Sequence, residues 1–294
     1  MTNLQNFSHY LAGLIEGDGS IVVPVKRYSD KGRKRYPSIQ ICFHAKDFPL
    51  ALTILQNLKH GSLAKKRGKN AYVLSVNNMS GIERVISLIR GKMRTPKVEA
   101  LQRLINWVVE DKRLSKREMG TIGEAVIEEL QHVALDTSPL LSNAWLSGFI
   151  EADGHFAVRV TQAGKYPLKM ECRFELEQKQ KDKHGNDWFA VCNDITQNLK
   201  ASMKETKINT KWPKYRLRTV NITSNTLLEE YLRRFPLFGV KFLDFQDWAV
   251  VLSLFRAKSH KRALSQIIKI KSTMNDQRQE FDWSHMVNFY YVRD

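Results

Sequence analysis

Two aspartates occupy the same position in a nine-residue segment that occurs twice in the chain. The segment LAGLIEGDG at 11–19 recurs as LSGFIEADG at 146–154, and its eighth residue is Asp18 in the first copy and Asp153 in the second. Each copy has the composition of a helix end, where unpaired carbonyls carry partial negative charge. Two carboxylates that converge there repel each other, and Mg²⁺, which favours carboxylate and carbonyl oxygens, relieves that repulsion. The pair therefore predicts a magnesium-dependent site, to which the preceding backbone carbonyls, those of Gly17 and Ala152, add ligands.

Small residues in the two segments have two interpretations. Gly17 and Gly19 could simply end a helix, which is a common use of glycine, but this does not account for the repeated acid. The small residues also lie four apart on one helix face, where they let two backbones approach closely. We therefore expect the two motif helices to pair. The spaced pairs are Gly13 with Gly17, and Gly148 with Ala152.

The elements that position the two aspartates also repeat. Alternating patterns predict a strand after each motif, at 20–25 and 155–161, and a second strand at 38–44 and 173–178. An amphipathic helix and two short strands follow in each half, and Val76-Asn77 matches Val220-Asn221. Ser80 with Glu83 indicates a capping box, and later helices are expected to begin at Thr95-Pro96 and at Asp244.

This order predicts an α+β fold of two pseudo-symmetric αββαββα halves. We expect an N-terminal half over 1–111, a linker over 112–140 that includes one helix, and a C-terminal half over 141–294. The sheets of both halves are expected to be antiparallel.

The charge indicates a polyanionic partner. The 294 residues include 47 Lys and Arg against 30 Asp and Glu, a net charge of +17. The halves share the excess, since 1–140 carry 22 − 13 = +9 and 141–294 carry 25 − 17 = +8. Nucleic acid binds a basic protein favourably because neutralised phosphates release their counterions. A generally basic surface without a specific ligand is the alternative.

The three cysteines have no close spacing, which predicts reduced thiols and neither a disulfide framework nor a zinc site. The sequence contains no apolar run of the kind that predicts a membrane span or a signal peptide.

The paired nonapeptide, in this order of elements, resembles the two motifs of the LAGLIDADG homing endonucleases in their single-chain form. The resemblance implies that the motif helices form the interface between halves and that the sheets form a saddle over the DNA major groove. It implies a monomer that cuts one phosphodiester in each strand of a long asymmetric duplex site, about two helical turns, with Mg²⁺-activated water, leaving short 3′ overhangs. Asp18 and Asp153 would be the metal-binding acids, and Glu16 and Glu151 would be structural.

Further catalytic roles follow from the same resemblance. Gln178 lies where the family often places a glutamine that positions water, and the matching position in the first half is Phe43. Lys92 and Lys241, each just before an expected helix start, match basic residues that stabilise charge near the scissile phosphate.

Strand alternation from each aspartate predicts the side chains that face DNA. Polar and basic residues of the later strands extend this set. The candidates are Ser20, Val22, Lys26, Tyr28, Tyr36, Ser38, Gln40, Lys65, Lys66, Arg67 and Lys69 in the first half, and His155, Arg159, Thr161, Lys169, Arg173, Arg216 and Arg218 in the second.

Two other functions are compatible with this fold. An intron-splicing maturase would bind intron RNA, and a DNA-binding regulator would bind without cutting and should lack one or both acids. The family is common in organelle introns, so a mitochondrial location is expected, and a chain made inside the organelle needs no targeting peptide.

Overall fold

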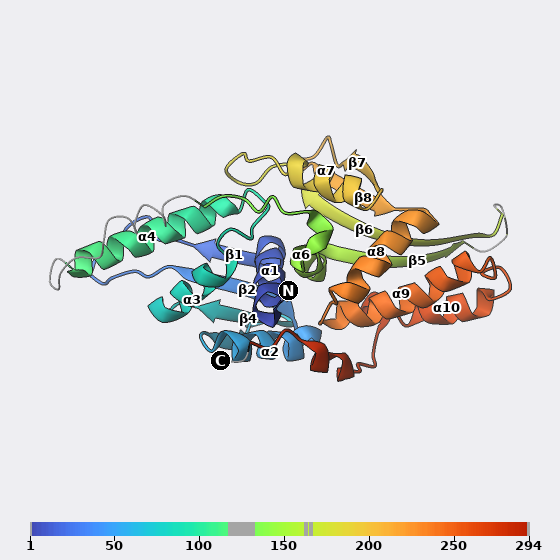
Figure 1. Cartoon of the computed structure of the whole chain (residues 1–294), viewed down its shortest axis with the longest axis horizontal. Coiled ribbons are helices and arrows are strands. Elements are labelled where there is room, and N and C mark those ends of the chain that lie inside the picture. Colours follow the sequence, from blue (N-terminus) through green and yellow to red (C-terminus); the bar gives the residue numbers. More distant parts are fainter. Residues whose placement is uncertain (1, 117–132, 162–163, 165–166, 293–294) are drawn as a thin grey trace. The chain divides into compact units, whose positions relative to one another are not determined.

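The computed structural model describes residues 2–116, 133–161, 164 and 167–292. The chain divides into two compact units (Figure 1). Unit 1 comprises residues 1–138 with 291–294, and unit 2 comprises residues 139–290. Each unit combines helices with one antiparallel four-stranded sheet.

Unit 1 begins with the helix that carries the first motif. Its elements are α1 (Asn3–Asp18), β1 (Gly19–Val22), β2 (Ser38–His44), α2 (Phe48–Leu58), β3 (Ser62–Lys65), β4 (Ala71–Val76), α3 (Met79–Ile89) and α4 (Val98–Lys116). The strands lie in the order β1-β2-β4-β3.

Within the described residues, unit 2 repeats this order and adds a helix at its end. Its elements are α6 (Trp145–Asp153), β5 (Gly154–Thr161), β6 (Lys169–Lys179), α7 (Phe189–Asn198), β7 (Ser202–Thr206), β8 (Lys214–Thr219), α8 (Ile222–Arg234), α9 (Val240–Arg256) and α10 (Leu264–Ser272). The strand order β5-β6-β8-β7 matches that of unit 1.

The two sheets also share their register, which confirms the expected α+β fold of two similar halves. Gly19 pairs with Ile41 in unit 1, and Gly154 pairs with Leu176 in unit 2. Alternate residues of each sheet face the core, as in β2, where Ile39 and Ile41 are buried between exposed neighbours. Burial of one face against helices supplies the main driving force for this arrangement.

Aromatic side chains dominate the core of unit 2. Phe156 of β5 packs against Phe174 of β6, and against Phe245 and Trp248 of α9, with ring centroids 5.4 to 5.6 Å apart. These rings fasten the sheet to α9, which Figure 1 shows running along β5. The strand that follows the second motif is therefore held on its inner face by large, stiff side chains.

The first strand is shorter than its sequence predicts. β1 ends at Val22, because Pro24 has no N–H to continue the ladder. Lys26 and Tyr28, which we expected to continue the alternation of this strand, lie in the loop that follows it, where Tyr28 forms an isolated bridge with Lys34.

The expected helix starts also need correction. Asn78, not Ser80, caps α3, because its Oδ1 accepts a hydrogen bond from the Gly81 N–H at 3.0 Å. Asn221 caps α8 in the same way, through the N–H of Ser224, so Asn78 matches Asn221 and the sequence pairing was one residue out of register. The Thr95-Pro96 turn precedes α4, which begins at Val98. α9 begins at Val240, four residues before the expected Asp244.

The end of the chain returns to unit 1. The N–H of Val292 donates to Asn57 Oδ1 at 2.8 Å, and Asn3 Nδ2 donates to the carbonyl of Tyr291. The expected linker at 112–140 includes residues 117–132, so most of it and its expected helix lie outside the described residues. Among the helices that the structure describes, none has the length and apolar composition to cross a membrane.

Candidate active site and nucleic-acid interface

Both motif aspartates are the last residues of their helices, as the sequence predicts. α1 ends at Asp18, which is exposed, and α6 ends at Asp153, which is half-buried. The glycine that follows caps each helix and starts a strand. A Cβ on Gly19 would lie 2.6 Å from the Ile15 carbonyl oxygen, and one on Gly154 would lie 2.7 Å from the Ile150 side chain. The glycines are therefore required by close packing, and the chain turns from helix to strand directly after each acid.

The glutamate two residues before each aspartate has a structural role. Glu16 is fully buried, and its carboxylate accepts hydrogen bonds from the backbone N–H groups of Arg94 and Thr95, the latter at 2.6 Å. Glu151 accepts from the N–H of Phe238 at 2.6 Å. Each glutamate thus fastens its motif helix to the segment just before α4 or α9, where a carboxylate complements free N–H groups.

This fastening places a lysine over the end of each motif helix. The Lys97 ammonium donates to the carbonyls of Glu16 at 2.6 Å and Gly19 at 2.9 Å, and also contacts those of Ile15 and Gly17. Lys241 donates to the carbonyls of Ile150 and Ala152, at 3.1 and 3.0 Å. A cation at a helix C-terminus neutralises its partial negative charge.

The lysine of unit 1 that matches Lys241 is therefore Lys97, and not the Lys92 expected from the sequence. Lys92 and Lys241 both precede an expected helix start, but α9 begins before Lys241, so this likeness does not hold. The signal that could have found Lys97 is its spacing from the cap of the preceding helix, because Lys97 follows Asn78 by 19 residues and Lys241 follows Asn221 by 20.

Lys92 lies in a different environment. Burial lowers the pKa of Lys92, and its charge interacts with Asp136. Asp136 also pairs with Arg94 at 2.9 Å and lies 3.8 Å from His9. This polar cluster connects the segment after α3 to the segment around Asp136. Lys92 therefore contributes to the packing of unit 1.

Gln178 contacts its aspartate directly. Its Nε2 donates to Asp153 Oδ2 at 2.7 Å, and the side chain is buried. The register that pairs Gly19 with Ile41 and Gly154 with Leu176 makes Phe43 the counterpart of Gln178, as expected. A phenyl ring cannot make this hydrogen bond, so the surroundings of the two aspartates differ.

The donor atoms at these helix ends fit a hard divalent ion. Each unit offers one carboxylate beside backbone carbonyls, and oxygen ligands are those that Mg²⁺ prefers. The carbonyls of Gly17 and Ala152, expected as further ligands, already accept hydrogen bonds from Lys97 and Lys241, which leaves the carboxylates as the stronger donors. Within the described ranges, no group of three or more His, Cys, Asp or Glu side chains could hold a metal alone.

The outward face of the unit 1 sheet carries four of the candidates expected in that half. Ser20, Val22 and Gln40 are exposed on this face, and Ser38 is half-buried. Tyr36 precedes β2, is 51% exposed, and has Trp107 as a ring neighbour at 6.1 Å. The remaining basic candidates are exposed at the end of β3 and in the turn after it. They are Lys65, Lys66, Arg67 and Lys69.

The outward face of the unit 2 sheet is a network of ion pairs. Glu175 contacts Arg173 at 2.6 Å, Arg218 at 3.3 Å and Arg159 at 3.6 Å. Glu177 pairs with Arg216 and with Lys214. The candidates that remain exposed on β5 are His155, Arg159 and Thr161.

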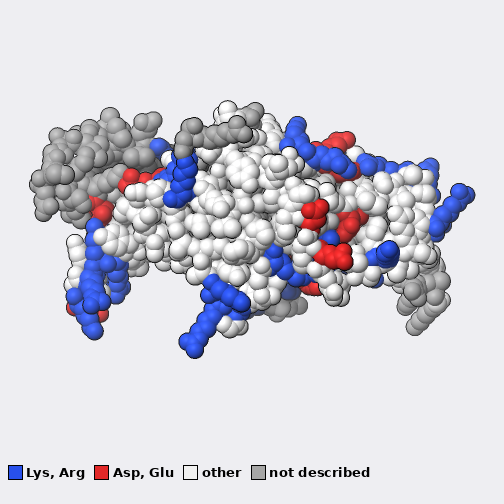
Figure 2. Space-filling model, turned by 90° about the horizontal axis from the view of Figure 1, so that it is seen from below, with Lys and Arg blue, Asp and Glu red and all other residues white. Residues whose placement is uncertain are grey.

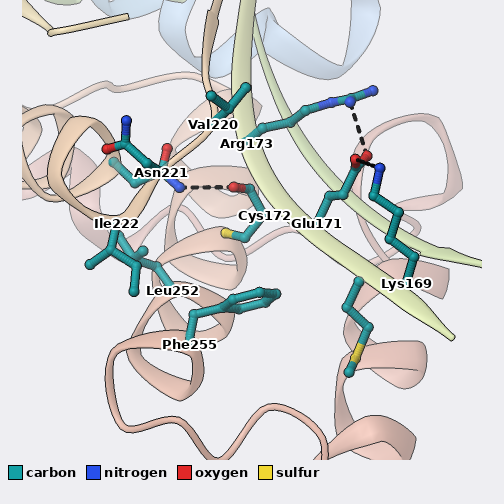
Figure 3. Close-up of a pocket in the computed structure, with 11 residues that line it drawn as sticks. Lys169, Glu171, Cys172, Arg173, Val220, Asn221, Ile222, Leu252 and Phe255 are labelled. Carbon is teal, nitrogen blue, oxygen red and sulfur yellow. Dashed lines mark hydrogen bonds and ion pairs between the residues drawn. The ribbon is translucent and has the colours of Figure 1, made fainter.

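Arg173 departs from the expectation of an exposed DNA contact. It is 7% exposed, and its guanidinium is held between Glu175 and Glu171, which also pairs with Lys169. Figure 3 shows the Arg173–Glu171–Lys169 chain at one wall of a pocket of about 490 Å³, between β6 and the ends of α8 and α9. Arg173 therefore serves first to order its neighbours on β6.

Charge is distributed unevenly over the surface. On the face drawn in Figure 2, Lys and Arg side chains project at the margins, Asp and Glu gather in small groups, and uncharged surface lies between them.

The three cysteines, Cys42, Cys172 and Cys192, are free, as expected. Burial raises the pKa of Cys192 to about 12 and also raises that of Cys172, so neither is a reactive thiolate.

Comparison with known proteins supports this architecture. The family model described as LAGLIDADG endonuclease matches residues 11–108 and 146–252. The intron-encoded DNA endonuclease aI3 of Saccharomyces cerevisiae is 27% identical, over 98% of this chain and 74% of its own length. A cox1 intron-2 protein of Schizosaccharomyces pombe, whose function is uncharacterised, is 27% identical over 91% of this chain and 72% of its own.

Solved structures share the fold. The LAGLIDADG homing endonuclease I-GzeII, in complex with its DNA target, matches with a TM-score of 0.67 and 21% identity over 92% of this chain and 99% of its own. I-LtrWI, bound to target DNA, matches with a TM-score of 0.68 and 19% identity over 94% of this chain and all of its own.

Proposed function

The chain belongs to the LAGLIDADG endonuclease family, whose model covers both of its repeats, and from this premise we propose that it is a site-specific endonuclease for double-stranded DNA. The observation that carries the proposal is the repeated arrangement at the helix ends. In both units an aspartate ends the motif helix, a glutamate fastens that helix, and a lysine covers its carbonyls. A protein that only bound DNA would not need this arrangement twice.

Asp18 and Asp153 would hold Mg²⁺ together with phosphate oxygens of the substrate. The bound ion supplies charge to stabilise the reacting phosphate and lowers the pKa of water. The protein's part is to fix the two carboxylates. Gln178 holds Asp153 in one orientation, and Lys97 and Lys241 keep a positive charge beside each acid. Each aspartate would serve one strand, so that both strands are cut with short 3′ overhangs.

Double-stranded DNA is the proposed partner for two reasons. Each unit has a four-stranded β-sheet with an outward face, and the chain has a net charge of +17. Strands can enter the major groove, where the four base pairs are distinguishable. Each sheet would contact one half of a site of about two helical turns, and one chain would supply both sheets. The names of several relatives describe intron-encoded proteins, and we propose an organellar, mitochondrial origin for this chain as well.

The test is to incubate the full chain with a library of random duplexes and Mg²⁺ and to sequence the new DNA ends. We expect double-strand breaks at one long, asymmetric site. Binding without breaks would indicate a DNA-binding regulator, although the presence of both acids argues against it. Affinity for intron RNA, measured beside cleavage, separates an additional maturase function from DNA cleavage.

A further inference from the structure

The shared register makes the two outward sheet faces comparable residue by residue. The central row of each sheet has one residue on each strand. In unit 1 the row is Ser20, Gln40, Ser75 and Ser62, and in unit 2 it is His155, Glu175, Arg218 and Ser202. The next row is Cys42, Val73 and Ala64 in unit 1, and Glu177, Arg216 and Lys204 in unit 2.

The face of unit 1 is neutral at all of these positions. Its longest polar side chain in the two rows is Gln40, which is exposed and lies 3.3 Å from the Ser38 hydroxyl. Small and apolar side chains surround it, including Val22, which is 49% exposed. An amide beside methyl groups is suited to adenine and thymine, since glutamine pairs with the adenine N6 and N7 atoms and apolar groups contact the thymine methyl.

The face of unit 2 places a carboxylate and a guanidinium where unit 1 has an amide and a hydroxyl. Glu175 replaces Gln40, and Arg218 replaces Ser75, with 3.3 Å between the carboxylate and the guanidinium. Glu177 and Arg216 form a second such pair in the next row. Arginine donates two hydrogen bonds to guanine O6 and N7, and glutamate accepts from cytosine N4. The pairs therefore carry the groups that complement a G·C base pair.

The glutamates also argue against a role in contacting phosphate. A carboxylate repels the DNA backbone, so a row in which each arginine stands beside a glutamate is poorly suited to the phosphates and well suited to base edges. The ion pairs restrict the arginine side chains before DNA arrives, which reduces the entropy lost on binding.

Resting on the proposed function, we propose that the two halves of the target differ in base composition. The half-site contacted by unit 2 is richer in G·C pairs, and the half-site contacted by unit 1 is richer in A·T pairs. Glu175 with Arg218, and Gln40 with Ser75, are the matched residues that set the difference.

The test exchanges these matched residues in the full chain. Duplexes bound by the wild type are selected from a random library and sequenced, and the same selection is repeated with E175Q/R218S and, separately, with Q40E/S75R. We expect one half of the wild-type site to be richer in G·C. E175Q/R218S should lower the preference for G·C over A·T at one or two base pairs of that half by about tenfold or more. Q40E/S75R should raise it by a similar factor in the other half.

Three outcomes are distinguishable. Equal composition of the two wild-type halves, or a variant that changes the half opposite to the one expected, overturns this inference while leaving the endonuclease in place. Failure of the wild type to enrich or cut any duplex overturns the proposed function itself. The two exchanges lie on different sheets, so a folding defect in one, checked by thermal unfolding, leaves the other as a valid test.

Discussion

At the scale of single residues, the chemistry of each motif depends on how one carboxylate and one ammonium are held at a helix end. The aspartate is fixed as the last residue of its helix. The glycine after it packs so closely against the preceding turn that no side chain would fit there. The lysine has the carbonyls of the last turn as hydrogen-bond acceptors, so its charge remains beside the acid. Gln178 adds a hydrogen bond to Asp153 that the phenyl ring of Phe43 cannot provide in the other unit.

The lysines give a first prediction. Replacing Lys97 with Met removes the cation beside Asp18 but leaves the predicted DNA-facing residues unchanged. Cleavage should therefore slow by about 10² to 10³, as for loss of one group that stabilises transition-state charge, while target affinity changes only a few-fold. Lys241→Met is expected to behave similarly, and single-turnover cleavage beside a binding titration measures both.

Lys92→Met is the matched control for charge. It removes the same charge from a side chain that interacts with Asp136, whereas Lys97 contacts the carbonyls at the helix end. We expect it to slow cleavage less than Lys97→Met does. A larger loss from Lys92→Met would restore the role inferred from sequence and contradict the assignment of Lys97.

At the scale of elements, the glutamates connect each motif helix to the segment that leads into α4 or α9, close in sequence to the lysine. Glu16 is fully buried and accepts hydrogen bonds from the N–H groups of Arg94 and Thr95, whereas Glu151, which accepts from the N–H of Phe238, is only half-buried. Because loss of a hydrogen bond to a buried charged group costs about 1.5 to 3 kcal/mol, α4 should depend on Glu16 more than α9 depends on Glu151.

Glu16→Gln tests this dependence. The amide places an N–H donor against backbone donors, so we expect the free energy of unfolding to fall by about 2 to 4 kcal/mol. Glu151→Gln should cost less, since its carboxylate is more exposed. Chemical denaturation of the two variants decides the matter, and an equal or smaller effect at Glu16 would contradict the assigned difference.

The ion pairs of the unit 2 sheet predict a pH dependence. Although burial acts to raise the pKa of Glu177, hydrogen bonds from Arg216 and Lys214 outweigh it and leave the pKa below the usual 4.5. A depressed pKa stabilises the fold above about pH 4.5, and the contribution is lost as pH falls through the folded value. Glu177→Gln should therefore be slightly less stable than the wild type at pH 7, by no more than about 1 kcal/mol for a partly exposed pair. The difference should shrink below pH 4.5 in thermal melts, and a difference that grew with acid would contradict the sign.

Much of this organisation could be predicted from the sequence, because the repeat carries it. The alternation of residues in strands and the motif spacing predict the sheets and the helix ends at Asp18 and Asp153. They also predict that Phe43 and Gln178 occupy equivalent positions in the two units. What failed depended on contacts between distant residues. Nothing local marks Asn78 over Ser80 as the cap of α3, or Lys97 over Lys92 as the lysine near the motif. Strand alternation correctly places Arg173 on the outward face of β6. Alternation does not show that Glu171 and Glu175 pair with Arg173 and leave it buried.

At the scale of the whole molecule, the excess of basic residues is shared by the two halves and would be used mainly at the margins of the sheets. The strand positions of unit 2 neutralise part of their own charge through ion pairs. The exposed turn after β3 has no acidic residue within its run of basic residues, so it is suited to phosphate contacts that position the DNA.

Salt dependence tests this distribution. The logarithm of affinity should fall linearly with the logarithm of salt concentration, with a slope of about 0.9 per phosphate contacted. Replacing the four basic residues of the turn with Ser should reduce the slope by about 3 to 4 if all of them contact phosphate. These are Lys65, Lys66, Arg67 and Lys69.

Four exposed lysines after α9 provide a charge-matched control. Their replacement with Ser changes the net charge equally and should leave the slope nearly unchanged. They are Lys258, Lys261, Lys269 and Lys271. Equal effects of the two quadruple variants would mean that net charge alone, without a defined interface, attracts the DNA.

The central claim is that one aspartate from each half is required for cutting and neither is required for recognition. It is tested most directly by Asp18→Asn and Asp153→Asn on the selected target duplex, with affinity and double-strand cleavage measured on the same preparations. Each variant should bind within a few-fold of the wild type and make no double-strand break in Mg²⁺. Cleavage of both strands at the wild-type rate by either variant would contradict the claim.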